Sequence, residues 1–456
     1  GRWFESTLLY QKMTKEKNNK PSKELPLGFV DRQEKELLVR DFIISNIKEV
    51  MIKYGFQYLE TPSFEYSDSI GKFLPDKERP DEGVFSFRDE NKWLSLRYDL
   101  TAPLARYVAK NFLEIPKPFK RYQLGTVWRN EKPGPGRFRE FLQFDADFVG
   151  TKSLQADAEL CVMISEILEN CGLTKSEYII KISSRKITEE LFKKININEN
   201  QQKLTALRAL DKIDRLGWDG VKELLGAGRK DKSGDFTKGA NLKSGDIEVI
   251  EKTLKKKSPE TEDLAEILKI FKDYNFTNFE FDPSIIRGLE YYTGVIFEVN
   301  LKFDVKNKKG QVIQFGSIGG GGRYDNLVNN FGNFDAPATG ISIGLDRLVY
   351  ALMQKKEFKV KQSKPVVICV FDKNSMKEYI NVQTILRKAG ISAEIYPGES
   401  KLKKQMEYAN KIKSPAVILY GEDEIKLGKP TLRNLSSGKE QSIKIKELVN
   451  EIKKII

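Results

Sequence analysis

The stretch from residue 126 to 150 limits the folds open to this chain more than any other. It reads TVWRNEKPGPGRFREFLQFDADFVG, in which two strand-like runs flank a loop rich in proline and glycine. We predict a long antiparallel hairpin with strands over residues 119–128 and 141–149 and a turn-rich loop over residues 131–139.

The side chains of this hairpin are unusual for a solvated sheet. Because side chains alternate between the faces of a strand, Arg129 shares a face with Glu131. A second shared face carries Arg137, Arg139, Phe141, Gln143, Asp145 and Asp147. An exposed sheet held by salt bridges is the alternative interpretation, but Phe and Gln within an arginine and aspartate ladder favour a binding surface. Arginine suits phosphate, because its guanidinium is always charged and binds bidentately.

The remaining patterns predict an α+β domain with a mostly antiparallel sheet, a helical insertion and a C-terminal α/β domain. Residues 34–54 have helical spacing, as do residues 156–171, and strands are expected at 56–59, 93–98 and 294–302. After residue 365, strands and helices alternate. The predicted boundaries are 1–25 for a disordered N-terminal extension, 26–171 and 284–354 for the two parts of the core, 172–283 for the insertion, 355–364 for a charged linker and 365–456 for the last domain.

Composition narrows the chemistry. The chain has 456 residues and a net charge of +13, which favours a polyanionic partner or reflects a lysine-rich proteome, and both interpretations stay open. Its apolar runs are too short to span a bilayer. Three scattered cysteines argue against a disulfide framework and against a cysteine zinc site, and they fit a reducing cytoplasm. The chain has no histidine, so any proton transfer must use carboxylates, substrate phosphate or water.

Three segments, taken in order, resemble the motifs of class II aminoacyl-tRNA synthetases. The second motif of that class is matched by WRNE at residues 128–131 and RFREF at residues 137–141. The third motif, G-x-G-x-x-R, is matched by SIGLDR at residues 342–347, with Ser342 in place of the first glycine. Residues 34–62 fit the first motif, a helix and a strand ending at Pro62. The resemblance implies the antiparallel catalytic fold of that class.

Within that class the chain is similar to the histidyl-tRNA synthetases. The segments that carry this similarity are RYDLT at 97–101, RGLEYYTG at 287–294 and GGGGRYD at 319–325, and the resemblance covers the chain from about residue 25. It implies a cytoplasmic homodimer that joins around Pro62. The implied reaction is ATP-dependent activation of L-histidine to histidyl-adenylate, followed by transfer to the 3′ end of tRNA(His). Mg²⁺ is expected on the ATP phosphates, without metal ligands on the protein, and the last domain is expected to bind the anticodon.

The resemblance also implies a role for individual side chains. Arg129 and Arg287 are expected to be the catalytic pair at the α-phosphate. Many bacterial members have glutamate where this chain has Asp99 and Asp147. Because aspartate is shorter, a backbone group or a water molecule must bridge the remaining distance to the substrate at one of these positions. Tyr291 is expected to pack in the core. The expected ATP-binding residues are Arg129, Glu131, Arg137, Arg139, Phe141 and Arg347, and the expected histidine-binding residues are Asp99, Thr101, Gln143, Asp147, Tyr292 and Tyr324.

Three other functions compete with this interpretation. The first is the regulatory subunit of the histidine-pathway phosphoribosyltransferase, which generally lacks the last domain and an intact RGLEYY segment. The second is a class II synthetase for proline, threonine or glycine, and the third is a module that only holds tRNA.

Two loops are candidates for contact with tRNA. The loop at residues 132–136 offers poor side-chain readout of the extra 5′ guanine of tRNA(His). The basic loop 229–238 is either an acceptor-stem clamp or a solvated loop.

Overall fold

The computed structural model of the chain describes residues 21–71, 83–231, 234–256, 258, 261–286, 292–307, 309–355, 364–398 and 400–456. The chain forms two compact units, Gly1–Lys359 and Val360–Ile456. Their boundary falls inside the predicted linker, residues 355–364. Of the predicted extension 1–25, only residues 21–25 are described, and they form no helix or strand.

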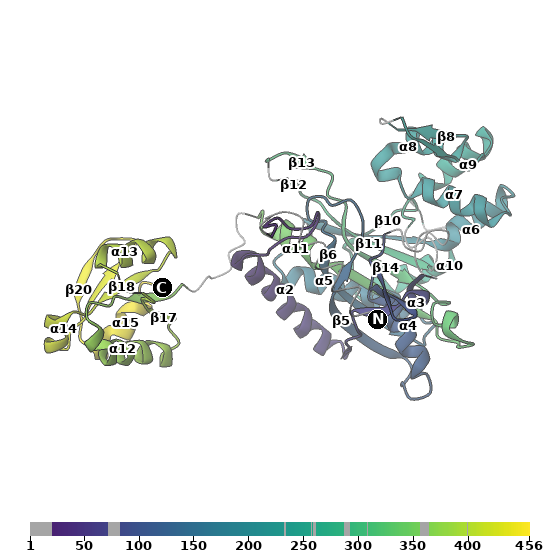
Figure 1. The fold of residues 1–456 in the computed structure, drawn as a ribbon. Helices are drawn as coiled ribbons and strands as arrows, with labels where there is room; N and C mark the ends of the chain where they lie inside the picture. Colours follow the sequence, from purple (N-terminus) through teal and green to yellow (C-terminus); the bar gives the residue numbers. More distant parts are fainter. Residues whose placement is uncertain are drawn as a thin grey trace. The chain divides into compact units, whose positions relative to one another are not determined.

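The first unit is built on an eight-stranded sheet, which positions most of the predicted site (Figure 1). Its inner pairs are antiparallel and only the two outermost pairs are parallel, which confirms the predicted mostly antiparallel sheet. The strands, in spatial order, are β1 (Gln57–Tyr58), β5 (Phe119–Trp128), β6 (Glu140–Val149), β15 (Ala338–Gly344), β14 (Ser317–Arg323), β11 (Val295–Leu301), β7 (Tyr178–Ser184) and β10 (Phe279–Phe281).

One face of this sheet is apolar and covered by helices. Helix α2 (Glu34–Lys53) contacts both α5 (Leu154–Asn170) and α11 (Leu345–Leu352), and α5 and α11 contact the middle strands. On β6 the buried Phe144, Ala146 and Phe148 alternate with Gln143, Asp145 and Asp147. Because neighbouring residues of a strand point to opposite faces, the second face of the sheet carries the polar side chains.

A smaller antiparallel sheet is formed by strands that precede β5 in the chain. It comprises β2 (Phe64–Tyr66), β4 (Lys92–Leu96) and β3 (Ser86–Asp89), in the order β2-β4-β3. Helix α3 (Ser67–Gly71) follows β2, and helix α4 (Thr101–Lys110) follows β4. The segment between β4 and α4 contains Asp99, so the smaller sheet fixes the start of one predicted binding element.

The predicted helical insertion, 172–283, differs from expectation at both ends. Strands β7 and β10 lie inside it yet belong to the central sheet. The run YIIKISS of β7 is buried on both faces, and such a run shows no alternation of apolar and polar residues to mark it as a strand. Between them are α6 (Arg185–Lys194), α7 (Asn200–Leu210), α8 (Ile213–Leu225), the hairpin β8 (Gly228–Lys230) and β9 (Phe236–Lys238), α9 (Ser244–Leu254) and α10 (Glu262–Asp273).

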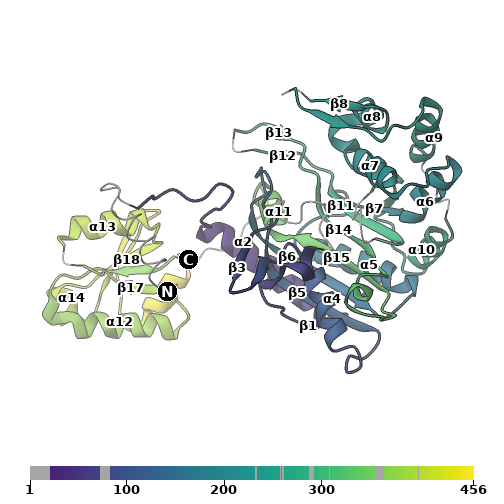
Figure 2. The ribbon, with the colours of Figure 1, turned by 45° about the vertical axis from the view of Figure 1, so that its right-hand side comes forward.

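The middle of the insertion stands apart from the central sheet within this unit. Figures 1 and 2 show α7, α8 and α9 grouped with the β8–β9 hairpin, whereas α10 returns to the sheet. Helix α10 contacts both α5 and β7. The basic loop predicted at 229–238 is therefore largely a short hairpin. Two further short strands, β12 (Val305–Lys306) and β13 (Val312–Ile313), pair with each other.

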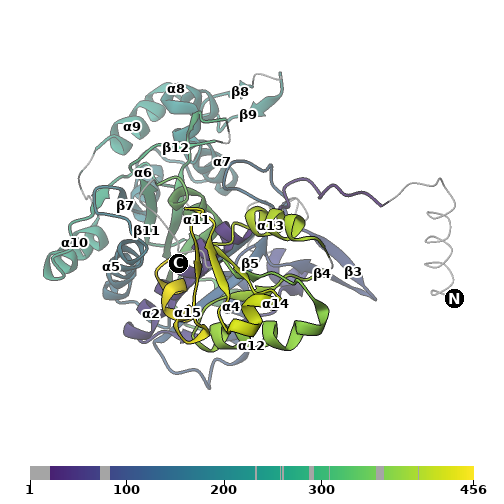
Figure 3. The same ribbon diagram turned by 90° about the vertical axis from the view of Figure 1, so that its left-hand side faces the viewer.

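The second unit is a three-layer α/β domain, as predicted. Its sheet has the order β17-β16-β18-β19-β20, with the first three strands parallel and the last two antiparallel. Helices α12 (Met376–Lys388) and α15 (Ile445–Lys453) pack on one face and α13 (Leu402–Lys411) packs on the other (Figure 3). The remaining elements are β16 (Val366–Ile368), β17 (Ala393–Ile395), β18 (Ala416–Leu419), α14 (Glu422–Leu427), β19 (Thr431–Asn434) and β20 (Glu440–Ser442).

Neither unit has, within its described residues, a helix that is both long and apolar enough to cross a membrane.

Candidate active site

The polar face of the central sheet gathers charged and neutral polar side chains from three neighbouring strands. Arg121 of β5 is directly opposite Asp147 of β6, and Gln123 is opposite Asp145. On the other side of β6, Ser342 of β15 is opposite Asp145. Directly opposed residues share a face of the sheet, so these side chains form one cluster. All but the half-buried Ser342 are buried.

Asp147 is held at the centre of this cluster. Its Oδ2 lies 3.0 Å from Nη2 of Arg121, and its Oδ1 accepts a hydrogen bond from the hydroxyl of Tyr324. A Cβ atom at Gly340 would come within 2.0 Å of Oδ1, so glycine is required opposite the carboxylate. Burial raises the pKa of Asp147, while Arg121 and Tyr324 oppose that rise. The side chain predicted to read imidazole is therefore a buried, oriented carboxyl group.

Asp145 is a second buried carboxyl group, and sequence reasoning gave it no role. Its Oδ1 accepts a hydrogen bond of 2.8 Å from Nε2 of Gln143, and its Oδ2 lies 3.4 Å from Oγ1 of Thr101. Burial first, and then the charge of Asp147, raise the pKa of Asp145 to about 7. The sequence feature that could have identified Asp145 is its position between Gln143 and Asp147 on the same face of β6.

The predicted ammonium-binding residues lie beside this cluster. Oδ1 of Asp99 accepts hydrogen bonds from the backbone N–H groups of Thr101 and Ala102, at 3.1 and 2.9 Å. Asp99 is thereby fixed at the start of α4, where the helix dipole favours an anion. Thr101 links this turn to Asp145. Tyr292 is half-buried and packs against the apolar cluster that contains Tyr324. The structure thus brings together all six predicted histidine-binding residues.

The arginine that follows β5 is held by aromatic rings. The guanidinium of Arg129 lies 4.5 Å from the ring centre of Tyr98 and 5.2 Å from that of Phe141. Its Nε donates a hydrogen bond of 3.3 Å to the backbone oxygen of Tyr98. The Tyr98 hydroxyl donates to Glu131. Three predicted ATP-binding residues, Arg129, Glu131 and Phe141, are therefore gathered around Tyr98, which the sequence did not single out.

Two further arginines meet beside Gly316. Nη2 of Arg137 and Nη2 of Arg347 each lie 3.7 Å from the place that a Cβ atom would take on this glycine, whose φ is +71°. The guanidinium of Arg347 also lies 4.3 Å from the ring centre of Phe315 and donates to its backbone oxygen. Phe315 was missed by sequence reasoning, although it lies four residues before the first glycine of the run at 319–325. The pair of cations forms a site suited to a polyphosphate.

The loop that connects β5 to β6, between Arg129 and Arg137, is tightly folded. Gly134 and Arg137 exchange two backbone hydrogen bonds, of 3.0 and 2.9 Å, around Pro135 and Gly136. Gly136 has a φ of +66°, which suits the third position of a type II turn after proline. Nε of Arg139 donates to the backbone oxygen of Glu131 at 3.2 Å. Arg287 and Tyr291 lie outside the described residues.

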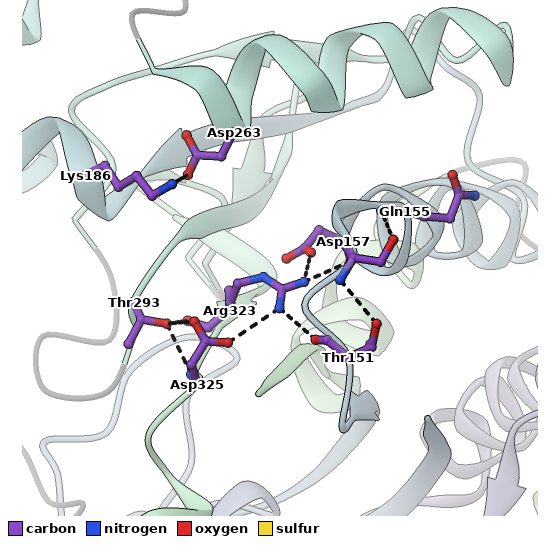
Figure 4. Close-up of polar contacts among 9 residues, drawn as sticks. Thr151, Gln155, Asp157, Lys186, Asp263, Thr293, Arg323 and Asp325 are labelled. Atoms are coloured by element: carbon purple, nitrogen blue, oxygen red, sulfur yellow. Dashed lines mark hydrogen bonds and ion pairs between the residues drawn. The ribbon is translucent and has the colours of Figure 1, made fainter. Parts of the chain in front are cut away.

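A buried ion pair fastens the segments that carry the two tyrosines (Figure 4). Arg323, at the end of β14, pairs with Asp157 of α5 and donates to the backbone oxygen of Thr151 at 2.9 Å. It also lies 3.4 Å from Asp325, which accepts a hydrogen bond of 2.7 Å from Thr293. Burial raises the pKa of Asp157 to about 6, and Arg323 opposes that rise. Because Tyr324 follows Arg323 and Tyr292 precedes Thr293, this network positions both.

Comparison with protein families identifies the chain. The family model of histidyl-tRNA synthetase matches residues 28–348. The chain belongs to the histidyl-tRNA synthetase family. A second model, that of the anticodon binding domain, matches residues 364–455, which is the second compact unit. The reaction of this family is the ATP-dependent activation of histidine and its transfer to tRNA(His), and the sequence-based prediction of family, fold and reaction is confirmed.

Relatives of this chain match it over nearly its whole length. A histidine–tRNA ligase of Bartonella quintana (strain Toulouse) is 46% identical over 94% of this chain and 92% of its own. One of Brucella ovis is 44% identical over 95% of this chain and 92% of its own. The crystal structure of histidyl-tRNA synthetase from Nostoc sp. PCC 7120 superposes with a TM-score of 0.72 at 26% identity, covering 96% of this chain and 100% of that one.

Proposed function

We propose that the polar face of the central sheet is a divided active site. In this proposal Arg129 and Arg287 clamp the α-phosphate of ATP, while Asp147 and Tyr292 read the imidazole of L-histidine. The supporting observation is that one hairpin carries a residue of each half, Arg129 and Asp147. From Phe141 to Asp147 strand β6 advances six residues, or about 20 Å. That length accommodates adenosine, phosphate and histidine in series.

Activation needs charge stabilisation rather than a base. A carboxylate oxygen of histidine attacks the α-phosphorus, the bond to the bridging oxygen breaks, and pyrophosphate leaves. The attacking carboxylate is already ionised at neutral pH, so no protein group has to remove a proton. Negative charge builds up around the phosphorus in the transition state, where positioned guanidinium groups stabilise it. A site without histidine side chains is fully equipped for this step.

Substrate selection follows from the buried polar groups. Neutral imidazole has one N–H donor and one acceptor nitrogen. We assign the donor to Asp147 and the acceptor to the hydroxyl of Tyr292, because the hydroxyl of Tyr324 already donates to Asp147. Asp99 and Thr101 would meet the ammonium group. Gln143 would meet the carboxylate.

The nucleotide half is assigned in the same way. Arg137 and Arg347, which meet beside Gly316, would hold the β- and γ-phosphates with Arg139 nearby. Phe141 and Arg347 would enclose adenine, and Glu131 would bind its amino edge. In the described parts of the chain no group of three or more acidic or cysteine side chains is placed to hold a metal ion. We propose that Mg²⁺ arrives on the ATP phosphates, with several of its waters kept. The free, buried cysteines suit the cytoplasm.

The decisive test of this function is ATP–pyrophosphate exchange with the intact protein. We expect exchange with L-histidine, and none with proline, threonine or glycine. An absence of exchange with every amino acid would overturn the proposal in favour of a regulatory or tRNA-holding role.

An exposed aromatic face supports a homodimer. On the smaller sheet, Phe64, Tyr66 and Phe87 share one face, because their register partners are Leu96 and Leu94. Their exposures are 48%, 47% and 44%. A contiguous apolar patch of this kind marks an interaction surface. We propose a second copy as the occupant, since this patch follows directly on the segment around Pro62.

A charge on this face should break the dimer. We expect the double variant Phe64→Asp/Phe87→Asp to sediment as a monomer, because two buried carboxylates in an apolar interface cost several kcal/mol. The matched control is Phe236→Asp, whose ring is 63% exposed on β9, and it should leave the oligomeric state unchanged. Analytical ultracentrifugation measures both. A double variant with the mass of the unaltered protein would contradict the proposed interface.

The tightly folded loop between Arg129 and Arg137 predicts that the enzyme depends little on the extra 5′ guanine of tRNA(His). Residues 134–137 form a tight turn, and the tip at residues 132–136 consists of Lys, Pro and Gly, so Lys132 is its only charged side chain. We expect aminoacylation of tRNA(His) transcripts with and without the extra 5′ guanine to differ by less than about fivefold in kcat/KM, because the weakest base-specific contact already supplies about 1 kcal/mol. A loss of about 10³-fold or more without the guanine would show that the loop reads it.

A further inference from the structure

Arg121 is a buried cation that the assigned mechanism does not use. It lies in the middle of β5, and its side chain is 0% exposed. Its Nη2 donates to the backbone oxygen of Leu100 at 2.9 Å and faces Oδ2 of Asp147 at 3.0 Å. Its Nε and Nη1 form no hydrogen bond with any described residue. A buried guanidinium is costly unless an anion compensates it, so the ion pair with Asp147 dominates its environment.

Arg121 forms an ion pair with only one of two buried carboxyl groups on β6. Asp145 and Asp147 project from the same face of β6, and two buried carboxylates so close together resist joint ionisation. The ion pair goes to Asp147, whereas Asp145 is contacted by the neutral donors Gln143 and Thr101. The hydroxyl of Tyr324 also donates to Asp147. The geometry thus places the negative charge on Asp147.

We propose that Arg121 is a positioning residue for histidine selection, which holds the Asp147 carboxylate as an oriented hydrogen-bond acceptor for the imidazole N–H of the substrate. This inference rests on the proposed function of the site. A protonated Asp147 would present a donor or a weak acceptor, and the imidazole would lose a charge-assisted hydrogen bond. Arg121 itself stays behind the carboxylate and is not assigned a contact with substrate.

The direction of the pH effect can be worked out from the surrounding charges. The groups that act on this pair are Asp145, Asp99, Arg97 and the hydroxyl of Tyr324. Burial raises the pKa of Asp147 and Arg121 lowers it. Without Arg121 the carboxyl group stays protonated to a higher pH, so histidine binding should recover only as the pH rises. In the unaltered protein, binding should level off near pH 7, once the substrate imidazole, with a pKa of about 6.5, is neutral.

The test compares Arg121→Met, which removes the charge, with Arg121→Lys, which keeps it. In ATP–pyrophosphate exchange between pH 6 and 9, we expect Arg121→Met to raise the KM for histidine about 10- to 100-fold at pH 7, as for the loss of a hydrogen bond to a charged group. That KM should fall again towards pH 9. The KM for ATP should change less than about twofold, and Arg121→Lys should restore most of the histidine affinity.

A matched control separates this role from a structural one. Lys355→Met removes a largely buried cation paired with Glu177 at 2.7 Å, in the same unit but outside the site. It should leave the pH profile of the histidine KM unchanged. If Arg121→Met does not fold, the double variant Arg121→Met/Asp147→Asn removes both charges together. That variant is expected to fold and to bind histidine weakly, with no recovery at high pH.

Three results would overturn the inference. They are an unchanged histidine KM in Arg121→Met, an equal rise in the KM values for histidine and ATP without pH dependence, and recovery at high pH in the double variant. Failure of the proposed function itself looks different, because the unaltered protein would then show no histidine-dependent exchange.

Discussion

Replacing Arg129 with alanine is expected to lower kcat for histidine-dependent ATP–pyrophosphate exchange by about 10³-fold, in the range observed when an arginine that stabilises phosphoryl-transfer charge is lost. The KM for histidine should change much less, because the charge that Arg129 meets is greatest in the transition state. The side chain is held for this task by the rings of Tyr98 and Phe141 and by the backbone oxygen of Tyr98. Arg287→Ala should act in the same direction.

The neighbouring residue provides the control for this experiment. Asn130 is exposed and has no assigned role, so Asn130→Ala should keep kcat within about twofold of the unaltered protein, as surface changes do. Arg129→Lys keeps the charge but loses the planar fork, and should fall between the two. A kcat for Arg129→Ala within tenfold of the unaltered value, in a protein that unfolds at the normal temperature, would remove Arg129 from the phosphate clamp.

The hairpin shows which parts of the fold a single sequence can predict. Strand β5 has its predicted bounds, and β6 begins one residue earlier than predicted, at Glu140. Both strands pair with their neighbour in sequence, and the proline and glycine loop between them defines the turn. The motif arginines follow from the same local pattern. Local pattern and family resemblance together thus predicted the hairpin and the order of its motif residues, whose roles are proposals.

Non-local pairing accounts for what the sequence did not reveal. The run Gly319–Gly322 has a low strand propensity, yet it forms β14 by pairing with β11 and β15. Glycine is required in this strand because a Cβ atom at Gly321 would come within 2.0 Å of the backbone oxygen of Gly340. Arg121 and Asp145 acquire their importance from the cross-strand register of β5, β6 and β15. A sequence alone does not specify that register, so neither residue was assigned a role.

The second large effect is expected at the opposite end of the hairpin, in Asp147→Asn. We expect the KM for histidine to rise about 100-fold, because a charge-assisted hydrogen bond is replaced by a neutral one and the amide can present its donor to the imidazole. The change in kcat should stay below about tenfold, and the KM for ATP should remain nearly constant. Steady-state exchange kinetics at saturating ATP measure the first two values.

Stability distinguishes this effect from damage to the fold. Asp147→Ala removes the partner of a fully buried guanidinium and opens a cavity, so it should cost about 3–5 kcal/mol of unfolding free energy. Asp147→Asn keeps the shape and should cost less, so its kinetics are the cleaner measurement. If the asparagine variant lowers kcat as strongly as Arg129→Ala while the KM for histidine stays constant, the division of the hairpin is wrong. If Arg129→Ala mainly lowers kcat and Asp147→Asn mainly raises the KM for histidine, then one hairpin carries two separate recognition tasks.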